Sequence, residues 1–159
     1  MRLGVHAVGR MKAGPERELA GRYLDRLAKA GPAVGLEFAG VAEIAESRAR
    51  EVAERRREEW AALAAHRGDA ALILLDERGR NFSSDEFAAA VAALRDRGRK
   101  RLVLAIGGPD GHDEAARQAA DAVLSFGAQT WPHQLVRVML AEQLYRAATI
   151  LSGHPYHRG

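Results

Sequence analysis

Short apolar runs alternate along this chain with longer amphipathic or charged stretches. At the N-terminus, Leu3, Val5 and Ala7 alternate with small or polar residues, and this period of two predicts a strand over residues 2–8. Similar apolar runs predict further strands at residues 34–39, 71–76 (ALILLD), 101–106 (RLVLAI) and 122–126 (AVLSF).

Helical patterns lie between these strands. One helix is predicted to begin near Pro15, which suits a first helical turn, and to end before Gly31. Ser83 and Glu86 have the spacing of a capping box and predict the start of another helix. Further helices are predicted at residues 47–66, 113–121 and 134–152, the last ending at Gly153.

This order of elements predicts the fold class. Strands that alternate with helices indicate an α/β fold with a mostly parallel sheet. Neither a repeat, nor a low-complexity tract, nor a linker interrupts the pattern, so we expect a single domain over residues 1–159.

The composition is that of a globular protein, with 47% hydrophobic and 28% charged residues and no apolar stretch long enough to cross a bilayer. The chain has no cysteine, which excludes disulfides, thiolate metal sites and cysteine nucleophiles. Its first residues lack the apolar region of a secretory signal, so a cytoplasmic location is expected.

The charge is modestly positive, at +3, and arises from 21 arginines and three lysines against 21 acidic residues. Guanidinium groups bind phosphate bidentately and stack on bases, so a polyanionic partner is permitted. The run Arg55-Arg56-Arg57 precedes Glu58-Glu59 in a predicted helix. Such spacing favours a solvated helical face over an RNA contact.

Ligands of open α/β sheets bind beyond the carboxyl ends of the strands, which directs attention to the segments after residues 76, 106 and 126. The segment GGPDG at 107–111 either lets the main chain approach a ligand or forms a plain turn. It lacks the G-x-G-x-x-G dinucleotide fingerprint. In the loop at 127–133 (GAQTWPH), Trp131 either stacks on a flat ring or fills an apolar gap, and His133 is either a capping neighbour or a proton carrier.

The last predicted helix carries a charge on an apolar stripe. Arg137 lines up with Ala141 and Leu144, so it must extend past the helix end, pair with an acid or contact a ligand. Glu142 and Arg146 have the spacing of a helical ion pair. Apolar residues cover more of this helix than one sheet face would bury, which predicts a subunit interface, most simply a two-fold dimer.

The C-terminal tail, GHPYHRG at 153–159, is rich in groups that bind nucleic acids. Tyrosine and histidine stack on unpaired bases, and arginine binds phosphate. An inert tail and a metal site are the alternatives. The metal site is disfavoured, because the tail has two histidines but no third strong ligand nearby in the sequence.

Taken in order, several of these segments closely resemble one known family. They are residues 106–111 (IGGPDG), 124–125 (LS), 130–138 (TWPHQLVRV), 141–147 (AEQLYRA) and 154–158 (HPYHR), together with Ala7-Val8-Gly9 and Leu75-Asp76. The chain resembles the ribosomal RNA large-subunit methyltransferase H family over its whole length.

The resemblance implies a SPOUT-type α/β fold whose C-terminal part forms a trefoil knot. It also implies a homodimer that uses S-adenosylmethionine to methylate N3 of a pseudouridine in large-subunit ribosomal RNA, on the assembled ribosome. By position, it places the cofactor against Leu75, Asp76, Gly107, Gly108, Gly127, Ala128, Gln129, Thr130, Trp131 and Pro132. Phe126, Gly127, Gln129 and Trp131 depart from the family's usual residues, so main-chain groups are expected to do most of the binding there.

The implied reaction moves a methyl group from a sulfonium to a ring nitrogen, so alignment and removal of the N3 proton are the protein's tasks. Candidates for the proton acceptor are His133, His154 and His157, and Arg137 could stabilise the nitrogen anion. The hypothesis is that the target nucleotide is oriented by Arg137, His154, Tyr156, His157 and Arg158. A ribosome-binding module without catalysis and a small-molecule enzyme are the rival interpretations.

Overall fold

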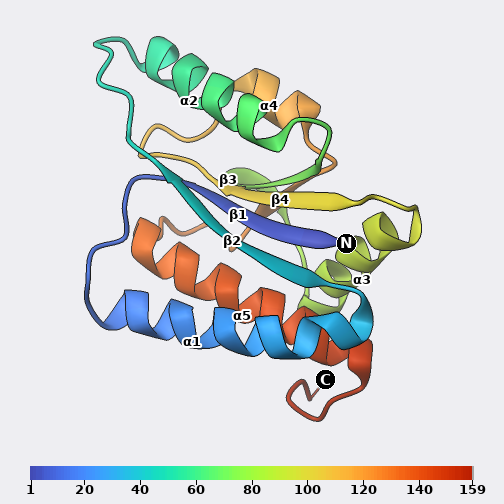
Figure 1. Ribbon diagram of the computed structural model, residues 1–159. Helices are drawn as coiled ribbons and strands as arrows, with labels where there is room; N and C mark the ends of the chain where they lie inside the picture. Colours follow the sequence, from blue (N-terminus) through green and yellow to red (C-terminus); the bar gives the residue numbers. More distant parts are fainter. Residues whose placement is uncertain (159) are drawn as a thin grey trace.

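The computed structural model describes residues 1–158 and contains one five-stranded sheet (Figure 1). Its strand order is β2-β1-β4-β3-β5, and every pairing is parallel. The strands are β1 (Arg2–Val8), β2 (Glu37–Ile44), β3 (Ala71–Asn81), β4 (Arg101–Ile106) and β5 (Ala122–Ser125). The predicted α/β class with a parallel sheet is therefore confirmed.

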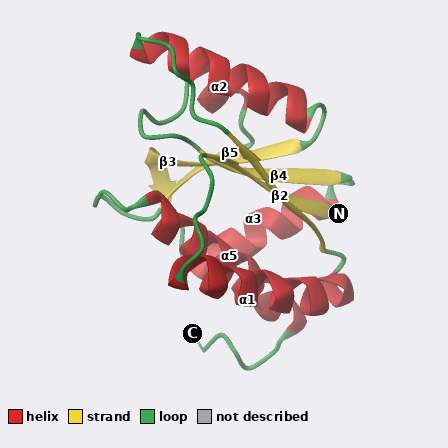
Figure 2. Ribbon diagram, turned by 60° about the vertical axis from the view of Figure 1, so that its left-hand side comes forward, coloured by secondary structure: helices red, strands yellow, loops and turns green. Residues whose placement is uncertain are grey.

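Five α-helices lie on the two faces of the sheet. They are α1 (Pro15–Ala30), α2 (Val52–Arg67), α3 (Ser84–Asp96), α4 (Glu114–Ala119) and α5 (His133–Ser152), and a 3₁₀ turn, Gly31–Val34, follows α1. Helices α2 and α4 cover one face, whereas α1, α3 and α5 cover the other (Figures 1 and 2). The result is a three-layer arrangement with the sheet in the middle.

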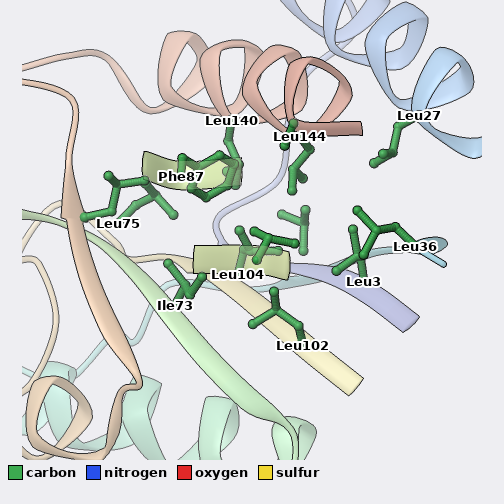
Figure 3. Close-up of a cluster of buried hydrophobic side chains, with 14 of the residues drawn as sticks. Leu3, Leu27, Leu36, Ile73, Leu75, Phe87, Leu102, Leu104, Leu140 and Leu144 are labelled. Carbon is green, nitrogen blue, oxygen red and sulfur yellow. The ribbon is translucent and has the colours of Figure 1, made fainter. Parts of the chain in front are cut away.

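The central strands are apolar on both faces because both faces are covered. In β3, Ala71, Ile73 and Leu75 belong to the larger core, while Leu72 and Leu74 belong to a smaller one. Figure 3 shows the larger core, where Leu104 of β4 and Phe87 of α3 lie near Leu140 and Leu144 of α5. Uninterrupted runs such as ALILL and LVLAI are the sequence signature of such strands.

Several predicted boundaries agree with the structure. Helix α1 spans the predicted residues, and the capping box is present: Glu86 N–H donates to Ser83 Oγ at 3.1 Å and Ser83 N–H donates to Glu86 Oε2 at 2.7 Å. The last helix begins one residue earlier than predicted, at His133, and is capped by Gly153.

Three predicted elements have wrong boundaries. The strand expected at 71–76 extends to Asn81, because Arg80 and Asn81 pair with β5. The strand expected at 34–39 begins at Glu37, because the 3₁₀ turn and left-handed Gly35 precede it, and pairing with β1 extends it to Ile44. The helix expected at 47–66 begins only at Val52.

Helix α5 lies against both α1 and α3 on one face of the sheet (Figure 1). Its Leu140, Leu144 and Ala148 are buried within the chain. Neighbouring helices thus cover much of the apolar surface that the sequence pattern assigned to a second subunit. Within residues 1–158, no helix is long and apolar enough to span a membrane.

Candidate active site

The part of β3 from Leu75 to Arg78, where its pairing with β4 ends, and the segments after β4 and β5 meet in one cleft of about 200 Å³. Parallel strands with neighbouring ends bring together residues that are far apart in the sequence. The cleft is lined by Arg56, Leu75, Asp76, Glu77, Arg78, Ile106, Gly107, Gly108, Pro109, Asp110, Gly111, Arg117, Leu124, Ser125, Phe126, Gly127, Gln129, Thr130, Trp131, His133 and Val136.

Most of the residues expected to hold the cofactor line this cleft. They are Leu75, Asp76, Gly107, Gly108, Gly127, Gln129, Thr130 and Trp131. Ala128 and Pro132 belong to the same loop but are not among the lining residues. His133 lines the cleft from the first turn of α5, so a titratable group is present at the expected place.

Asp76 forms a charged wall of the cleft together with Arg117, which the sequence analysis did not single out. Arg117 Nη1 lies 3.2 Å from Asp76 Oδ2, and the backbone N–H of Arg78 donates to Asp76 Oδ1 at 2.9 Å. Burial alone would raise the pKa of Asp76, but the bond from Arg78 and the positive charges nearby lower it below its ordinary value. The carboxyl group is therefore ionised.

Helix α2 fastens the glycine turn at residues 107–111. Arg55 Nε and Nη2 lie 2.6 and 3.1 Å from the two carboxylate oxygens of Asp110, and Arg56 Nε donates to the Asp110 carbonyl at 2.8 Å. The prediction of a solvated face is therefore wrong for Arg55 and Arg56. Sequence reasoning missed these contacts because they join residues 54 and 55 positions apart.

The glycines of this turn are required by what lies behind them. A Cβ atom at Gly107 would lie 3.2 Å from the ring of His112, and one at Gly108 would lie 3.0 Å from Glu59 Oε2. A side chain at either position would therefore have to displace His112 or Glu59. The turn presents bare main chain to the cleft as a consequence.

Trp131 resolves one of the open alternatives. Its side chain lines the cleft and is 38% exposed, and its Nε1–H donates to the Phe126 carbonyl at 3.3 Å. An indole in this position does not fill a gap in the core. It remains available to stack on a flat ring.

Arg137 pairs with an acid, which is one of the three alternatives that the sequence left open. Its Nη1 lies 3.0 Å from Glu43 Oε2 of β2, and its Nη2 donates to the carbonyl of Gly9 after β1. Burial acts to raise the pKa of Glu43, but hydrogen bonds from Met11 N–H and from Arg137 lower it overall. Arg137 lies beside the cleft without lining it.

The tail folds back along α5 to the middle of the helix. Tyr156 Oη donates to Glu142 Oε1 at 2.9 Å, and the ring of Tyr156 lies 4.8 Å from the guanidinium of Arg146. Glu142 also accepts from Arg146 Nε at 2.9 Å, as the helical spacing predicted. His157 Nε2 lies 3.4 Å from Asp85 Oδ2 of α3. Residues 154–158 are therefore packed against α5 and α3 at Tyr156 and His157 and are not a detached tail.

The packing of the tail buries Tyr156 in part but leaves other tail residues in solvent. Burial, followed by hydrogen bonds with Tyr23 and Glu142, raises the pKa of Tyr156, so its hydroxyl stays protonated and can act as a donor. His154 and Arg158 remain exposed.

Within residues 1–158, no cluster of three histidine or acidic side chains has the arrangement of a metal site.

Helix α5 also sets the distance between the tail and the cleft. It has 20 residues and therefore spans about 30 Å. His133 lies at the cleft, whereas the tail leaves the last turn and folds back to Glu142, about 14 Å from His133 along the helix. The structure thus brings together the cofactor residues expected from the sequence. It does not bring the tail to the cleft of the same chain.

Comparison with known proteins identifies the class of the chain. The sequence model described as "Predicted SPOUT methyltransferase" matches residues 1–157. A solved structure of a probable methylase family protein from Haemophilus influenzae Rd KW20 shares the fold, with a TM-score of 0.50 at 12% identity over 99% of this chain and 70% of that one.

Two curated relatives narrow the assignment. The ribosomal RNA large subunit methyltransferase H of Chelativorans sp. (strain BNC1) is 69% identical over 99% of this chain and 91% of the relative. The protein of the same name from Mesorhizobium japonicum (strain LMG 29417 / CECT 9101 / MAFF 303099) is 68% identical over 99% of both chains. The chain therefore belongs to the SPOUT methyltransferases and, within them, to the ribosomal RNA large subunit methyltransferase H family.

Membership of this family confirms the resemblance, the fold class and the cofactor, S-adenosylmethionine. The cleft suits such a group: Leu75, Phe126 and Trp131 offer apolar contacts for an adenine ring, and the glycine turn offers main-chain polar groups.

Proposed function

We propose that this enzyme methylates N3 of a pseudouridine in large-subunit ribosomal RNA on the assembled ribosome, as a cytoplasmic homodimer. The observation that carries the proposal is the single cleft formed by three strand ends in a SPOUT methyltransferase chain. The curated relatives, which are large-subunit rRNA methyltransferases by name, support the class of substrate. The proposal goes beyond the names of these relatives in three respects: the pseudouridine target, the assembled ribosome and the dimer.

Within this proposal, S-adenosylmethionine occupies the cleft and supplies a methyl group activated by the sulfonium charge. Leu75, Phe126 and Trp131 contact the adenine, while the main chain at Gly107 and Gly108 binds polar edges of the cofactor. Ala128 and Pro132 act by shaping the loop that carries Gln129 and Thr130. We also propose that residues 1–159 form a single domain. Its C-terminal part is proposed to form a trefoil knot.

The tail requires a second subunit to take part in the reaction. It follows the last turn of α5 and folds back only to Glu142, which lies nine residues, or about 14 Å along the helix, from His133 at the cleft. The exposed apolar side chains Leu19, Trp131 and Leu135 lie toward the cleft end of the α1–α5 layer. A two-fold interface that covers them and pairs α5 antiparallel with its copy would bring each tail toward the partner's cleft.

The assembled site then has to orient the nucleotide and remove one proton. As the new C–N3 bond forms and the C–S bond breaks, the N3–H proton leaves for a base, for which His133 and the tail residues His154 and His157 are candidates. Tyr156, as a protonated donor, and Arg158 hold the nucleotide. Arg137, now paired with Glu43, contributes positive charge beside the cleft.

The small net charge supports the assembled ribosome, rather than free rRNA, as the substrate of the enzyme. At +3, one chain neutralises few phosphates, and affinity for bare RNA follows the number of phosphates contacted. A dimer doubles the contact surface, and an assembled ribosome adds contacts that naked RNA lacks. Activity on protein-free rRNA is therefore expected to be poor.

The test is transfer of labelled methyl from S-adenosylmethionine to ribosomes that lack the modification, beside isolated large subunits and free rRNA. Label in a large-subunit pseudouridine, obtained only with assembled particles, is the expected result. Equal turnover on free rRNA would contradict the ribosome requirement. Tight ribosome binding without any label would favour a binding module without catalysis.

A further inference from the structure

The glycine turn rests, on the side away from the cleft, on three buried polar side chains that we call the polar support: His6 of β1, Glu59 of α2 and His112 beyond the turn. Their exposed fractions are 1%, 8% and 8%. They line a cavity of about 10 Å³. A space of this size admits one water molecule and no larger ligand, so the polar support does not bind a cofactor or substrate of its own.

Two members of the polar support contact the turn closely. The Cε1 and Nε2 atoms of His112 lie 3.2 Å from the position of a Cβ at Gly107, and Glu59 Oε2 lies 3.0 Å from that of Gly108. These side chains leave the main chain no room to move inward. Any shift of Glu59 or His112 is therefore passed to the wall of the cleft on the other side of the turn.

The charge of Glu59 makes it an unusual packing residue. Its Oε1 accepts from the backbone N–H of Ser47 at 3.2 Å. Burial raises the pKa of Glu59, and the charges of Asp110 and Glu46 add to the rise, whereas the Ser47 bond and Arg55 oppose it. A carboxylate in this environment costs folding stability, so its place behind the turn calls for a role other than stability.

The imidazoles around it are neutral. Burial, reinforced by His66 and His112, lowers the pKa of His6 to about 4, and burial also lowers the pKa of His112 despite the nearby Asp76 carboxylate. Among the described residues, neither Nε2 atom has a hydrogen-bond partner. Glu59 is therefore the acidic member of the polar support, and its carboxyl group lies directly against Gly108.

We propose that Glu59, backed by His6 and His112, is a positioning residue for the methyl donor: it holds the main chain of Gly107 and Gly108 where S-adenosylmethionine binds. This inference rests on the proposed placement of the cofactor in the cleft. Glu59 acts through the turn and does not touch the cofactor.

The test is Glu59→Gln, which keeps the side-chain shape. A glutamine must either point its NH₂ group at the close contact with Gly108 or point it at the Ser47 N–H, which then loses its acceptor. Either arrangement shifts the turn. We expect the Kd for S-adenosylmethionine, measured by calorimetry, to rise about tenfold, with an unfolding midpoint no lower than that of the wild type.

Two comparisons separate positioning from other effects. Glu54→Gln, on the exposed face of the same helix, is expected to bind the cofactor as the wild type does. S-adenosylhomocysteine lacks the sulfonium charge, so a displaced turn weakens both ligands by the same factor. A loss confined to S-adenosylmethionine would mean that Glu59 acts by direct charge attraction and would overturn the proposal.

The remaining outcomes are also decisive. Wild-type affinity in Glu59→Gln, or a loss that only parallels a lower unfolding midpoint, would overturn the positioning role. If the wild type itself bound no S-adenosylmethionine, the proposed function would fail instead.

A double-mutant cycle of Gly108→Ala and Glu59→Ala gives a second measurement. The double variant is expected to lose less affinity than the two single losses combined, because Glu59→Ala removes one of the two side chains, Glu59 and Val8, that a Cβ at position 108 would meet. Strictly additive losses would contradict the contact between Glu59 and the turn.

Discussion

The two ends of α5 hold their functional groups in different ways. At the cleft end, contacts between distant parts of the chain fix the glycine turn, as when Arg55 binds Asp110 and Glu59 packs on Gly108. At the tail end, Tyr156 and His157 contact nearby side chains of α5, and the rest of the tail stays exposed. The cleft is thus formed within one chain, whereas the tail, under the proposed function, acts at the cleft of a partner subunit.

This difference predicts separable defects. A change behind the glycine turn should impair cofactor binding even without RNA. A change in the tail should leave cofactor binding intact and impair methylation of the ribosome.

The largest effect is expected from Gly108→Val. Its Cβ would lie within 3.2 Å of both Glu59 and Val8, so the turn must move and S-adenosylmethionine binding should fall below detection by calorimetry. Gly21→Ala is the matched control, because a Cβ at Gly21 meets nothing within 4 Å. Wild-type affinity in Gly108→Val would show that the cofactor binds elsewhere.

Acidification should lower the free energy of unfolding through the protonation of His6. The imidazole takes up a proton near pH 6.5 in the unfolded chain but only near pH 4 in the folded one. The unfolded state therefore binds more protons between these values, and the free energy of unfolding should fall by about 3 kcal/mol as the pH drops from 6.5 to 4.

Chemical denaturation across this pH range measures the effect. His6→Leu should remove this part of the slope, while His154→Ala in the exposed tail should retain it. An unchanged slope in His6→Leu would mean that another group is responsible.

A smaller effect is expected from Arg158→Ala in the tail. Loss of one charge-assisted contact to the nucleotide should lower the methylation rate on ribosomes about thirtyfold without changing the Kd for S-adenosylmethionine. Lys29→Ala, an exposed cation on α1, serves as control. A wild-type rate in Arg158→Ala would remove Arg158 from the proposed site.

The smallest effect is expected from Arg55→Ala. The Arg55–Asp110 pair is partly exposed, so its loss should weaken cofactor binding only about fivefold. Arg57→Ala, on the exposed part of the same helix, should have no effect. A defect in ribosome methylation without a change in cofactor affinity would assign Arg55 to RNA binding instead.

Much of the cleft could be predicted because its signals are local. The apolar runs at β3, β4 and β5 locate the strand ends, and parallel strands place those ends at one edge. The segments that contain Asp76 and the glycine turn were located in this way, and the family resemblance then named the residues within them. The boundaries of β2 and α2 were predicted poorly, since pairing with β1 and the loop before Val52 override the local pattern.

The order of residues alone was sufficient for the α/β class, the positions of three strand ends and the family, because periodicity and ordered motifs are properties of neighbouring residues. The folded chain was needed to show that Glu43 pairs with Arg137, that α2 supports the glycine turn, and that the tail folds back along α5 to Glu142. The first two contacts join residues that are dozens of positions apart, and no local pattern specifies which distant side chain fills the space behind a turn.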